Sequence, residues 1–421
     1  MQQPFLSPAL LPRLSCAAVL AAFACGAAAS EGDTASGPEL GFSGFGSLGA
    51  VHASIRSADF TSSIMKDSGA GRSKRWSPHV DSRLGLQLDL AVDKQWSAVL
   101  QAVSEQRSDG SYNPVIEWAN IKYQVTPDLS LRFGRIALPV FLAADYRKIG
   151  YAYPWVRPPV EMYNAIPLSN SDGIDASYRW NVGAFKNVTQ GFFGSTRKAL
   201  WDNAALAAHG IAGLSHTTSY RSASMRVSLL KADLSIDLAR ELFDAYRQFG
   251  APGIALAERF DVDHQRVYAM SAGMNYDPGN WFVTGELGRI KSWSYLGDTY
   301  TAYASAGYRF GDLTPYLTYA IVDPDSAISD PGLAPSGMPP QLAYTATVLN
   351  GHLNRLLSTI AVQSTFTAGA RWDLQPNLAL KVQYDRVRPQ AGSRGSLVNV
   401  RDDYVSDRAV HVASAVLDFV F

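Results

Sequence analysis

The chain has 421 residues, and its 37 Lys and Arg residues balance its 37 Asp and Glu residues, so the formal charge at pH 7 is zero. This balance argues against a nucleic-acid-binding protein, which would carry a basic excess. The two cysteines, Cys16 and Cys25, lie in the amino-terminal segment described next. The remainder of the chain therefore has no disulfides and no thiolate chemistry.

The amino-terminal segment 1–29 has the composition of a secretory signal peptide. Arg13 precedes an apolar run over 14–26, and three alanines at 27–29 supply small residues for cleavage. We therefore predict a signal peptide over 1–29 and one domain over 30–421. A lipoprotein acylated at Cys25 is the alternative, although Phe23 is a poor fit to the acylation motif. No later apolar run is long enough for a transmembrane helix.

The domain over 30–421 shows hydrophobicity that alternates with a period of two, which is typical of β-strands with one apolar and one polar face. Leu84, Leu86 and Leu88, for example, alternate with Arg83 and Gln87. The pattern predicts sixteen strands, at 41–56, 80–92, 95–107, 113–125, 129–135, 172–181, 186–197, 209–220, 222–233, 264–276, 280–292, 297–310, 313–322, 362–374, 377–388 and 409–421.

The links between these strands alternate between short and long. The short ones, such as 93–94, 126–128 and 277–279, consist of turn residues. The long ones lie at 57–79, 106–112, 136–171, 198–208, 234–263, 293–296, 323–361 and 389–408. This predicts an all-β fold, a single transmembrane antiparallel β-barrel with both termini on the side of the short turns. Apolar residues at helical spacing predict short helices in 234–263 and 323–361, over the barrel mouth.

The last predicted strand ends in two aromatic residues, Phe419 and Phe421, on its apolar face. A strand with this ending resembles the sorting signal of Gram-negative outer-membrane barrels. The resemblance implies that the barrel-insertion machinery recognises Phe419 and Phe421, and that this strand closes the barrel against the first. An ordinary carboxy-terminal strand of a soluble β-protein is the alternative.

The chain also resembles the sixteen-stranded general porins of Gram-negative bacteria, of the proteobacterial type. The resemblance rests on the motifs at 41–46 and 131–135 and on Phe421. It implies passive diffusion of ions and small hydrophilic solutes, outer-membrane lipid and lipopolysaccharide as surroundings, and assembly as a homotrimer. It further implies that the third long link, 136–171, folds into the lumen and narrows it. The constriction is then expected to involve Asp145, Arg147, Lys148, Arg157 and Glu161.

Strand parity assigns charged side chains to the lumen, because a Lys or Arg facing lipid at the bilayer midplane costs about 2–4 kcal/mol. The predicted pore wall contains Arg83, Lys122, Arg132, Arg179, Glu286, Arg309, Arg371 and Lys381. Opposed charges across a narrow aqueous gap create a transverse field that orients dipolar solutes. We expect the loop charges to face Arg83, Lys122 and Arg132. The mid-strand position of basic residues predicts a weak preference for anions.

Other chemistry finds little support in the sequence. The glycines at 44–49 match the dinucleotide-binding pattern, but they lie inside a strand and no helix follows, so no cofactor is predicted. The seven histidines lack metal-ligand spacing. Asp323, Asp325 and Asp330 could hold a divalent cation or bridge to lipopolysaccharide, with a solvated acidic loop as the alternative. We predict no catalytic site. A substrate-selective channel, and an outer-membrane enzyme or adhesin, remain the competing hypotheses.

Overall fold

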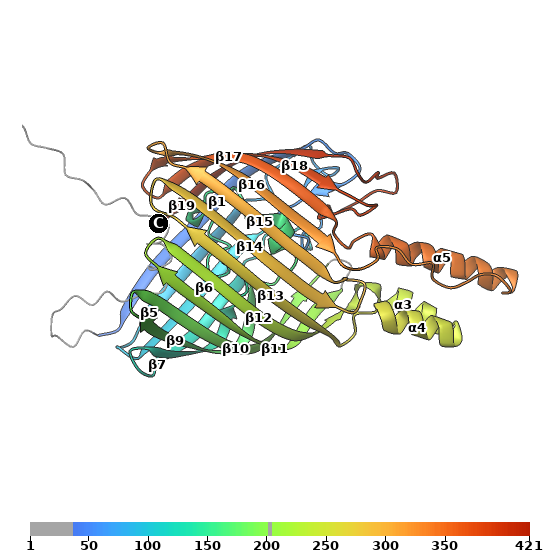
Figure 1. Cartoon of the computed structure of the whole chain (residues 1–421), viewed down its shortest axis with the longest axis horizontal. Helices are drawn as coiled ribbons and strands as arrows, with labels where there is room; N and C mark the ends of the chain where they lie inside the picture. Colours follow the sequence, from blue (N-terminus) through green and yellow to red (C-terminus); the bar gives the residue numbers. More distant parts are fainter. Residues whose placement is uncertain (1–36, 201–203) are drawn as a thin grey trace, which may run out of the picture.

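The computed structural model describes residues 37–200 and 204–421, and the predicted signal peptide lies outside them. Sixteen long strands form one closed antiparallel barrel, as the sequence predicts (Figure 1). They are β1 (Glu39–Ala53), β5 (Arg83–Ala91), β6 (Trp96–Glu105), β7 (Val115–Gln124), β8 (Leu129–Ala137), β9 (Asn170–Val182), β10 (Phe185–Ala199), β11 (Ala205–Tyr220), β12 (Ala223–Ile236), β13 (Gln265–Tyr276), β14 (Trp281–Ser292), β15 (Thr299–Tyr308), β16 (Leu313–Pro324), β17 (Gln363–Gln375), β18 (Leu378–Pro389) and β19 (Val410–Val420).

Each barrel strand pairs with its neighbours in chain order, and β1 closes the ring by pairing with both β5 and β19. The first long link adds three two-residue strands, β2 (Asp59–Phe60), β3 (Ala70–Gly71) and β4 (Trp76–Ser77). Along β5, Leu84, Leu86 and Leu88 are exposed on the outer surface, whereas Gly85 is buried. The apolar side chains therefore face lipid, and the polar face of each strand lines the lumen.

The seam between β1 and β19 is closed by aromatic rings that lie over glycines. Phe421 and Gly44 exchange two backbone hydrogen bonds, of 2.9 and 3.0 Å. A Cβ atom built on Gly44 would lie 2.3 Å from Cζ of Phe421, and one on Gly46 would lie 2.3 Å from Cζ of Phe419. Only glycine leaves room for these two rings on the outer face.

Deletion of Phe421 should lower the amount of folded barrel in the outer membrane. The deletion removes both hydrogen bonds to Gly44 and the ring that covers it. It also removes the aromatic residue that the insertion machinery is expected to recognise. The measurement is the fraction of heat-modifiable protein in outer-membrane preparations. Deletion of Glu39, at the same end of the barrel but on the part of β1 that pairs only with β5, is the control, and equal assembly of both variants would contradict the prediction.

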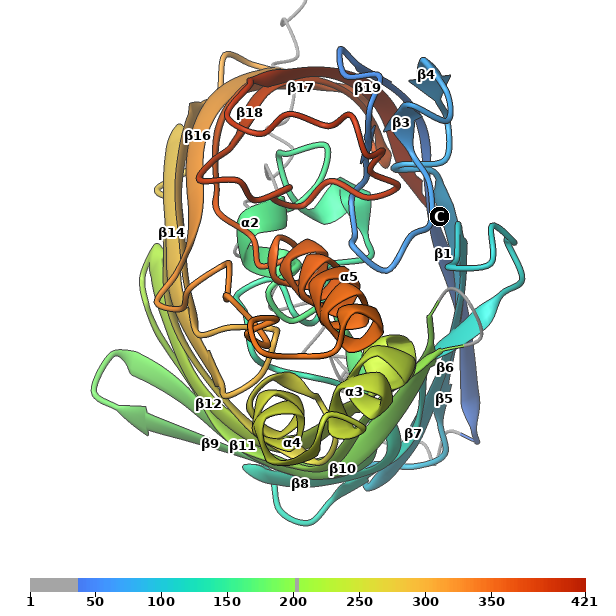
Figure 2. The ribbon, with the colours of Figure 1, turned by 90° about the vertical axis from the view of Figure 1, so that its right-hand side faces the viewer.

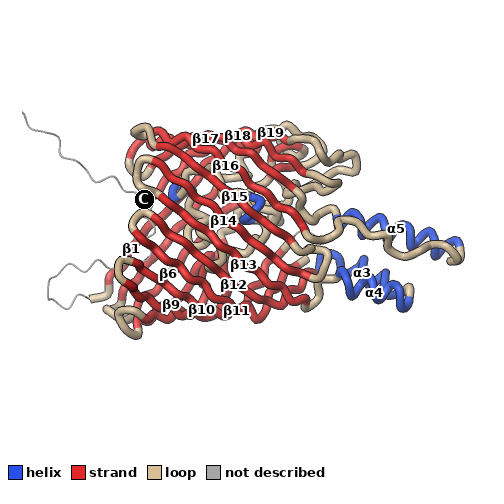
Figure 3. The backbone as a smooth tube through the Cα atoms, viewed as in Figure 1, coloured by secondary structure: helices blue, strands red, loops and turns tan. Residues whose placement is uncertain are grey.

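The two ends of the barrel differ. Short turns lie at one end, and the long links lie at the other, where three helices project beyond the strands (Figures 1 and 3). These are α3 (Arg240–Arg247), α4 (Gly250–Phe260) and α5 (Pro340–Leu357), with a short 3-10 helix, η2 (Asp237–Ala239), before α3. Viewed from this end, the helices lie over part of the barrel mouth (Figure 2). Phe243, Tyr246 and Leu353 are fully buried among them.

The helices confirm the prediction for both links, with one difference. The spacing in 234–263 predicts a single helix that begins near Ser235, but β12 continues through Ile236 and the link then forms α3 and α4. Gly250, at a φ of 65°, separates the two helices because it adopts the left-handed conformation that favours glycine. No helix in the described part of the chain has both the length and the apolar character needed to cross a bilayer.

Candidate functional site: the lumen and its inner loop

The link between β8 and β9 folds into the lumen, and we call its residues 138–169 the inner loop. It contains a 3-10 turn, η1 (Gly150–Ala152), and a single helical turn, α2 (Val160–Tyr163), both seen inside the barrel in Figure 2. Phe141, Trp155 and Met162 are buried in one apolar cluster with Tyr303 and Tyr316 of the wall. This apolar contact explains why the loop lies against the wall instead of extending into solvent.

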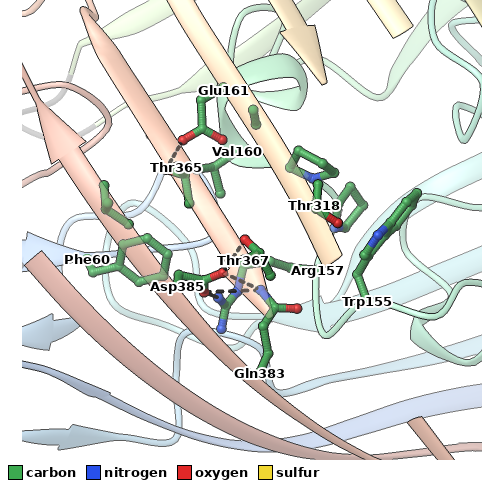
Figure 4. Close-up of a pocket in the computed structure, with 14 residues that line it drawn as sticks. Phe60, Trp155, Arg157, Val160, Glu161, Thr318, Thr365, Thr367, Gln383 and Asp385 are labelled. Atoms are coloured by element: carbon green, nitrogen blue, oxygen red, sulfur yellow. Dashed lines mark hydrogen bonds and ion pairs between the residues drawn. The ribbon is translucent and has the colours of Figure 1, made fainter. Parts of the chain in front are cut away.

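Arg157 fixes the inner loop to the wall through ion pairs. Its Nε and Nη2 atoms donate to the two carboxylate oxygens of Asp81 at 2.9 and 2.6 Å. Its Nη1 atom donates to Asp385 at 2.9 Å (Figure 4). Nη2 also donates to the Ser414 hydroxyl at 2.6 Å. Arg157, Asp81 and Asp385 are each at most 4% exposed. The guanidinium therefore donates its hydrogen bonds to residues of the barrel, and none of them goes to a group on the aqueous pathway.

Lys381 forms a second attachment, and here the wall supplies the cation. Its Nζ donates to the carbonyl oxygens of Gly150, Tyr153 and Trp155 at 2.6, 2.6 and 2.9 Å. The same atom pairs with Asp418 at 2.8 Å, and both side chains are completely buried. A Cβ atom on Gly150 would lie 2.2 Å from Oδ1 of Asp418. Glycine at this position therefore allows the loop to approach the wall closely.

Glu286 on β14 holds the first part of the loop. Its carboxylate accepts hydrogen bonds from the Leu142 N–H at 2.9 Å and from the hydroxyls of Tyr163 and Tyr303 at 2.7 and 2.8 Å. Glu286 is 2% exposed. These three donors stabilise a buried carboxylate that has no ion-pair partner among the described residues.

Glu161 holds the second part of the loop in a similar way. Its Oε1 accepts hydrogen bonds from the Gln363 amide at 2.6 Å and from the Thr365 hydroxyl. Burial raises the pKa of Glu161 above its ordinary value, while the hydrogen bonds from Thr365 and Gln363 act in the opposite direction. No Lys or Arg in the described part of the chain forms an ion pair with it.

Basic side chains gather beside the start of β5 and the end of β6, and we call Lys66, Arg83, Arg147 and Lys148 the basic cluster. Arg83 donates to the backbone carbonyls of Arg147 and Lys148 at 3.4 and 3.5 Å. Lys148 pairs with Glu105. Within the described chain, the other three cations donate hydrogen bonds only to carbonyl oxygens, and Arg147 also lies over the Tyr163 ring. The cluster therefore carries an excess of positive charge.

The remaining predicted wall residues are partly neutralised. Arg132 pairs with Asp175 at 2.6 Å, Arg309 with Asp277 at 2.7 Å and Arg371 with Asp373 at 2.7 Å. Arg371 also donates to the Tyr151 carbonyl at 2.6 Å, so it holds the loop as well. Lys122 lies beside Arg132 in register, and Arg179 lies on β9 in register with Val188.

The partners of the loop charges differ from the expected ones. The sequence predicts that these charges face Arg83, Lys122 and Arg132. Instead, Asp145 pairs with Arg226 at 3.0 Å, and Arg157 and Glu161 contact later strands. Buried charges require partners of opposite sign or hydrogen-bond donors. These come from β12 for Asp145, from β18 and Asp81 for Arg157, and from β17 for Glu161. Of the loop residues, only Arg147 and Lys148 lie beside Arg83.

Arg226, Gln363 and Asp418 are loop-holding residues that the predicted site lacks. Parity could have placed Arg226 in the lumen, because it is a charge on a strand whose other face carries Met225 and Val227. No signal in the sequence indicates which loop atom each of them contacts.

Comparison with known proteins agrees with this architecture. Residues 16–401 match the family described as Gram-negative porin. The chain belongs to this family. Accordingly, the protein is an outer-membrane porin whose barrel forms a channel for passive diffusion. Porins are channels rather than enzymes.

Solved porin structures share the fold at low sequence identity. The outer membrane channel DcaP of Acinetobacter baumannii has a TM-score of 0.54 at 12% identity, and the aligned region covers 92% of this chain and 99% of the DcaP chain. An anion-selective porin from Comamonas acidovorans has a TM-score of 0.53 at 13% identity, over 91% and 100%. Salmonella typhi OmpF, in complex with daunomycin, has a TM-score of 0.54 at 12% identity, over 91% and 98%. A search of curated protein sequences finds no match.

Proposed function

We propose that this porin passes ions and small hydrophilic solutes past the inner loop with a weak preference for anions, and that it has no catalytic role. The observation that carries the proposal is the unequal pairing of the cations around the loop. Arg157 and Lys381 are buried and paired with carboxylates, Arg157 with Asp81 and Asp385 and Lys381 with Asp418. On the side of β5 and β6, the basic cluster has one ion-pair partner, Glu105, among the described residues.

The positions of the unpaired cations support an anion preference more than the number of lumen cations does. Buried ion pairs produce little net field at a distance, whereas cations that bond only to carbonyl oxygens keep their full charge. Beside the basic cluster, the loop and wall leave a small cavity lined in part by Glu117, Arg147 and Lys148. Glu117 and Asp145 carry opposing negative charges at this cavity, and Asp145 is paired with Arg226. Opposed charges beside the cluster favour a preference that is weak.

The test is the reversal potential of single channels in a salt gradient. A modest displacement toward the anion equilibrium potential is expected. A channel strongly selective for cations would contradict the proposal. A substrate-selective channel would instead show saturable block of the current by one solute.

We further propose that lipopolysaccharide contacts the outer surface at the ends of the strands that carry the long links. Outward-facing basic residues at this level outnumber acidic ones, which are Asp172, Asp233, Asp323 and Asp325. The basic residues are Arg135, Arg197, Lys231, Arg266, Arg289, Lys291, Arg386 and Arg388. Phosphate groups of the lipid headgroups would complement this belt. Replacement of Arg386 and Arg388 by Gln should lower the lipopolysaccharide that co-purifies, and an unchanged amount would contradict this contact.

The family resemblance also supports a homotrimer. Native mass spectrometry of the protein released from detergent should give three times the mass of one mature chain. A monomeric mass under conditions that keep the barrel folded would contradict this state.

Anion preference should decrease as the pH rises from 7 to 9. Burial lowers the pKa of Lys66, in the first long link, to about 8, and the attraction of Glu105 offsets only part of this effect. Lys66 is charged below this pKa and neutral above it, so the cluster loses one positive charge as pH rises. The charged groups around it are Glu105, Arg83, Asp81 and Lys148.

The reversal potential at both pH values measures this change, and Lys66→Arg is the matched control. Arginine keeps its charge over this range, so the variant should lose the pH dependence. An equal pH dependence in the variant would show that another group titrates.

A further inference from the structure

Three neighbouring strands, β9, β10 and β11, carry polar side chains on the face of the barrel that contacts lipid (Figure 1). Exposure identifies this face, because Tyr178, Phe193 and Leu214 are 50%, 56% and 48% exposed. The same parity directs four polar side chains outward, which we call the polar patch: Asn187 and Thr189 of β10, and His216 and Thr218 of β11. Polar groups that face hydrocarbon are costly, so the polar patch requires a physical reason.

The polar patch differs from the rest of the outer surface at the same height. Its residues lie within five positions of the short turns at 183–184 and 221–222. On the other described barrel strands, the outward positions at this distance from a short turn carry apolar or aromatic residues or glycine. Met225 and Val227, for example, lie in register with Thr218 and His216. Short turns are periplasmic in such barrels, so the polar patch lies where the headgroups of the periplasmic leaflet meet the hydrocarbon.

Hydrogen bonds join the polar patch into one chain. The Trp180 indole N–H donates to the Thr189 hydroxyl at 3.2 Å, and that hydroxyl lies 2.9 Å from Nδ1 of His216. Nε2 of His216 lies 3.0 Å from the Thr218 hydroxyl, which donates to Oδ1 of Asn187 at 2.9 Å. A neutral His216 that accepts from Thr189 and donates to Thr218 satisfies all these contacts. The indole, hydroxyl and imidazole hydrogens are therefore used, and lone pairs on the oxygen atoms remain.

Aromatic rings and one cation lie between the polar patch and the turns. Phe185 and Tyr220 stack with ring centroids 4.7 Å apart, and the Trp180 ring lies 5.8 Å from the His216 ring. The faces of such rings attract a cation. In the turn that follows β11, the Arg221 guanidinium lies over the Tyr220 ring at 5.2 Å. Oxygen acceptors beside aromatic rings suit a small ammonium group, and Arg221 suits a phosphate of the same headgroup.

A depression begins next to the polar patch, on the side toward the long links. Gly191 follows Thr189 on the outward face of β10, and a Cβ atom built on it meets no atom within 4 Å. Its partner in register on β9 is Ala176, which is also small. Phe193 and Leu214, both about half exposed, border these two residues. The depression therefore offers an acyl chain dispersion contacts on several sides.

We propose that the polar patch binds the headgroup of an aminophospholipid of the periplasmic leaflet, with the chemistry of phosphatidylethanolamine. The primary ammonium donates hydrogen bonds to the oxygens of Thr189 and Thr218, the phosphate lies toward Arg221, and one acyl chain lies over Gly191. Phosphatidylglycerol has no ammonium group, and phosphatidylcholine has the positive charge but no N–H to donate. The site lies at the end of the barrel opposite to the surface proposed for lipopolysaccharide.

The test is native mass spectrometry of the full mature protein in mild detergent, after incubation with an equimolar mixture of the three phospholipids with identical acyl chains. About tenfold more phosphatidylethanolamine than either other lipid should remain bound per barrel, which is the difference that one or two net hydrogen bonds supply. Retention of either other lipid to the same extent or more would overturn the proposal. The readout does not depend on conduction, so failure of this proposal and failure of the proposed selectivity are separate outcomes.

Variants on the outer surface assign the site. Thr189→Val combined with Thr218→Val keeps the shape of both side chains and removes their oxygens, so the preference should disappear while the barrel remains heat-modifiable. Ser104→Ala is the matched control, because it removes an outward hydroxyl in register with Leu84, near the long links. If the double variant does not fold, Gly191→Leu fills the depression and should lower the amount of bound lipid. An unchanged preference in the first variant, or unchanged retention in the second, would overturn the assignment.

Discussion

Replacing Arg157 with Met should increase the single-channel conductance and the size of the solutes that pass. The guanidinium holds the inner loop to Asp81 and Asp385, both buried. Removing one partner of a buried ion pair costs about 3–5 kcal/mol, because the remaining charges are left without compensation. The smallest response that relieves this cost is movement of the loop away from the two carboxylates. Such movement opens the narrowest part of the lumen.

The conductance of single channels and the swelling of liposomes in sugars of increasing size measure this effect. Arg309→Met is the matched control, because Arg309 also pairs with a buried aspartate, Asp277, but close to a short turn and away from the inner loop. This control should assemble with nearly normal conductance. An Arg157→Met channel with unchanged conductance and size limit would show that this ion pair does not fix the constriction.

Replacing Arg83 with Gln should shift the reversal potential toward cation selectivity. Arg83 forms no ion pair within the described chain, and its guanidinium bonds to backbone carbonyls of the inner loop. Glu105, which lies in register with Arg83 on β6, offsets part of this charge. The remainder acts on the aqueous pathway, where the effective dielectric constant beside the loop is lower than in bulk water. Arg132→Ala should shift the potential in the same direction, since it leaves Asp175 unpaired.

The control for this experiment is Arg266→Gln, which removes the same charge from the outer surface, where Arg266 is exposed to solvent. Salt screens such a charge from the lumen, so the reversal potential should stay unchanged. Equal shifts in the Arg83 and Arg266 variants would show that total charge, and not position in the lumen, sets the selectivity.

The sequence predicts the barrel well because each strand carries its own information. The alternation of Leu84, Leu86 and Leu88 with polar or small residues indicates which face of the strand contacts lipid. The turn residues indicate where strands end. The contacts of the inner loop are different, because they join residues far apart in the chain. Arg157 and Asp385 are separated by 228 positions, and Lys381 and Gly150 by 231. Neither residue of such a pair has a local pattern that indicates the other.

Strand parity predicts which side chains point into the lumen, but it does not predict the contacts that they make there. Parity places Lys381 and Glu286 in the lumen, but it does not distinguish a charge that lines water from one that binds the loop. That distinction depends on burial, and both residues are at most 2% exposed. The sequence consequently overestimates how many of the lumen charges face the aqueous pathway.

Recording of single channels in planar bilayers under a KCl gradient tests whether the inner loop narrows a water-filled channel beside a basic cluster. We expect discrete steps of reproducible conductance and a reversal potential displaced modestly toward the anion equilibrium potential. Absence of conductance steps from folded protein, or a strong displacement toward the cation equilibrium potential, would contradict it.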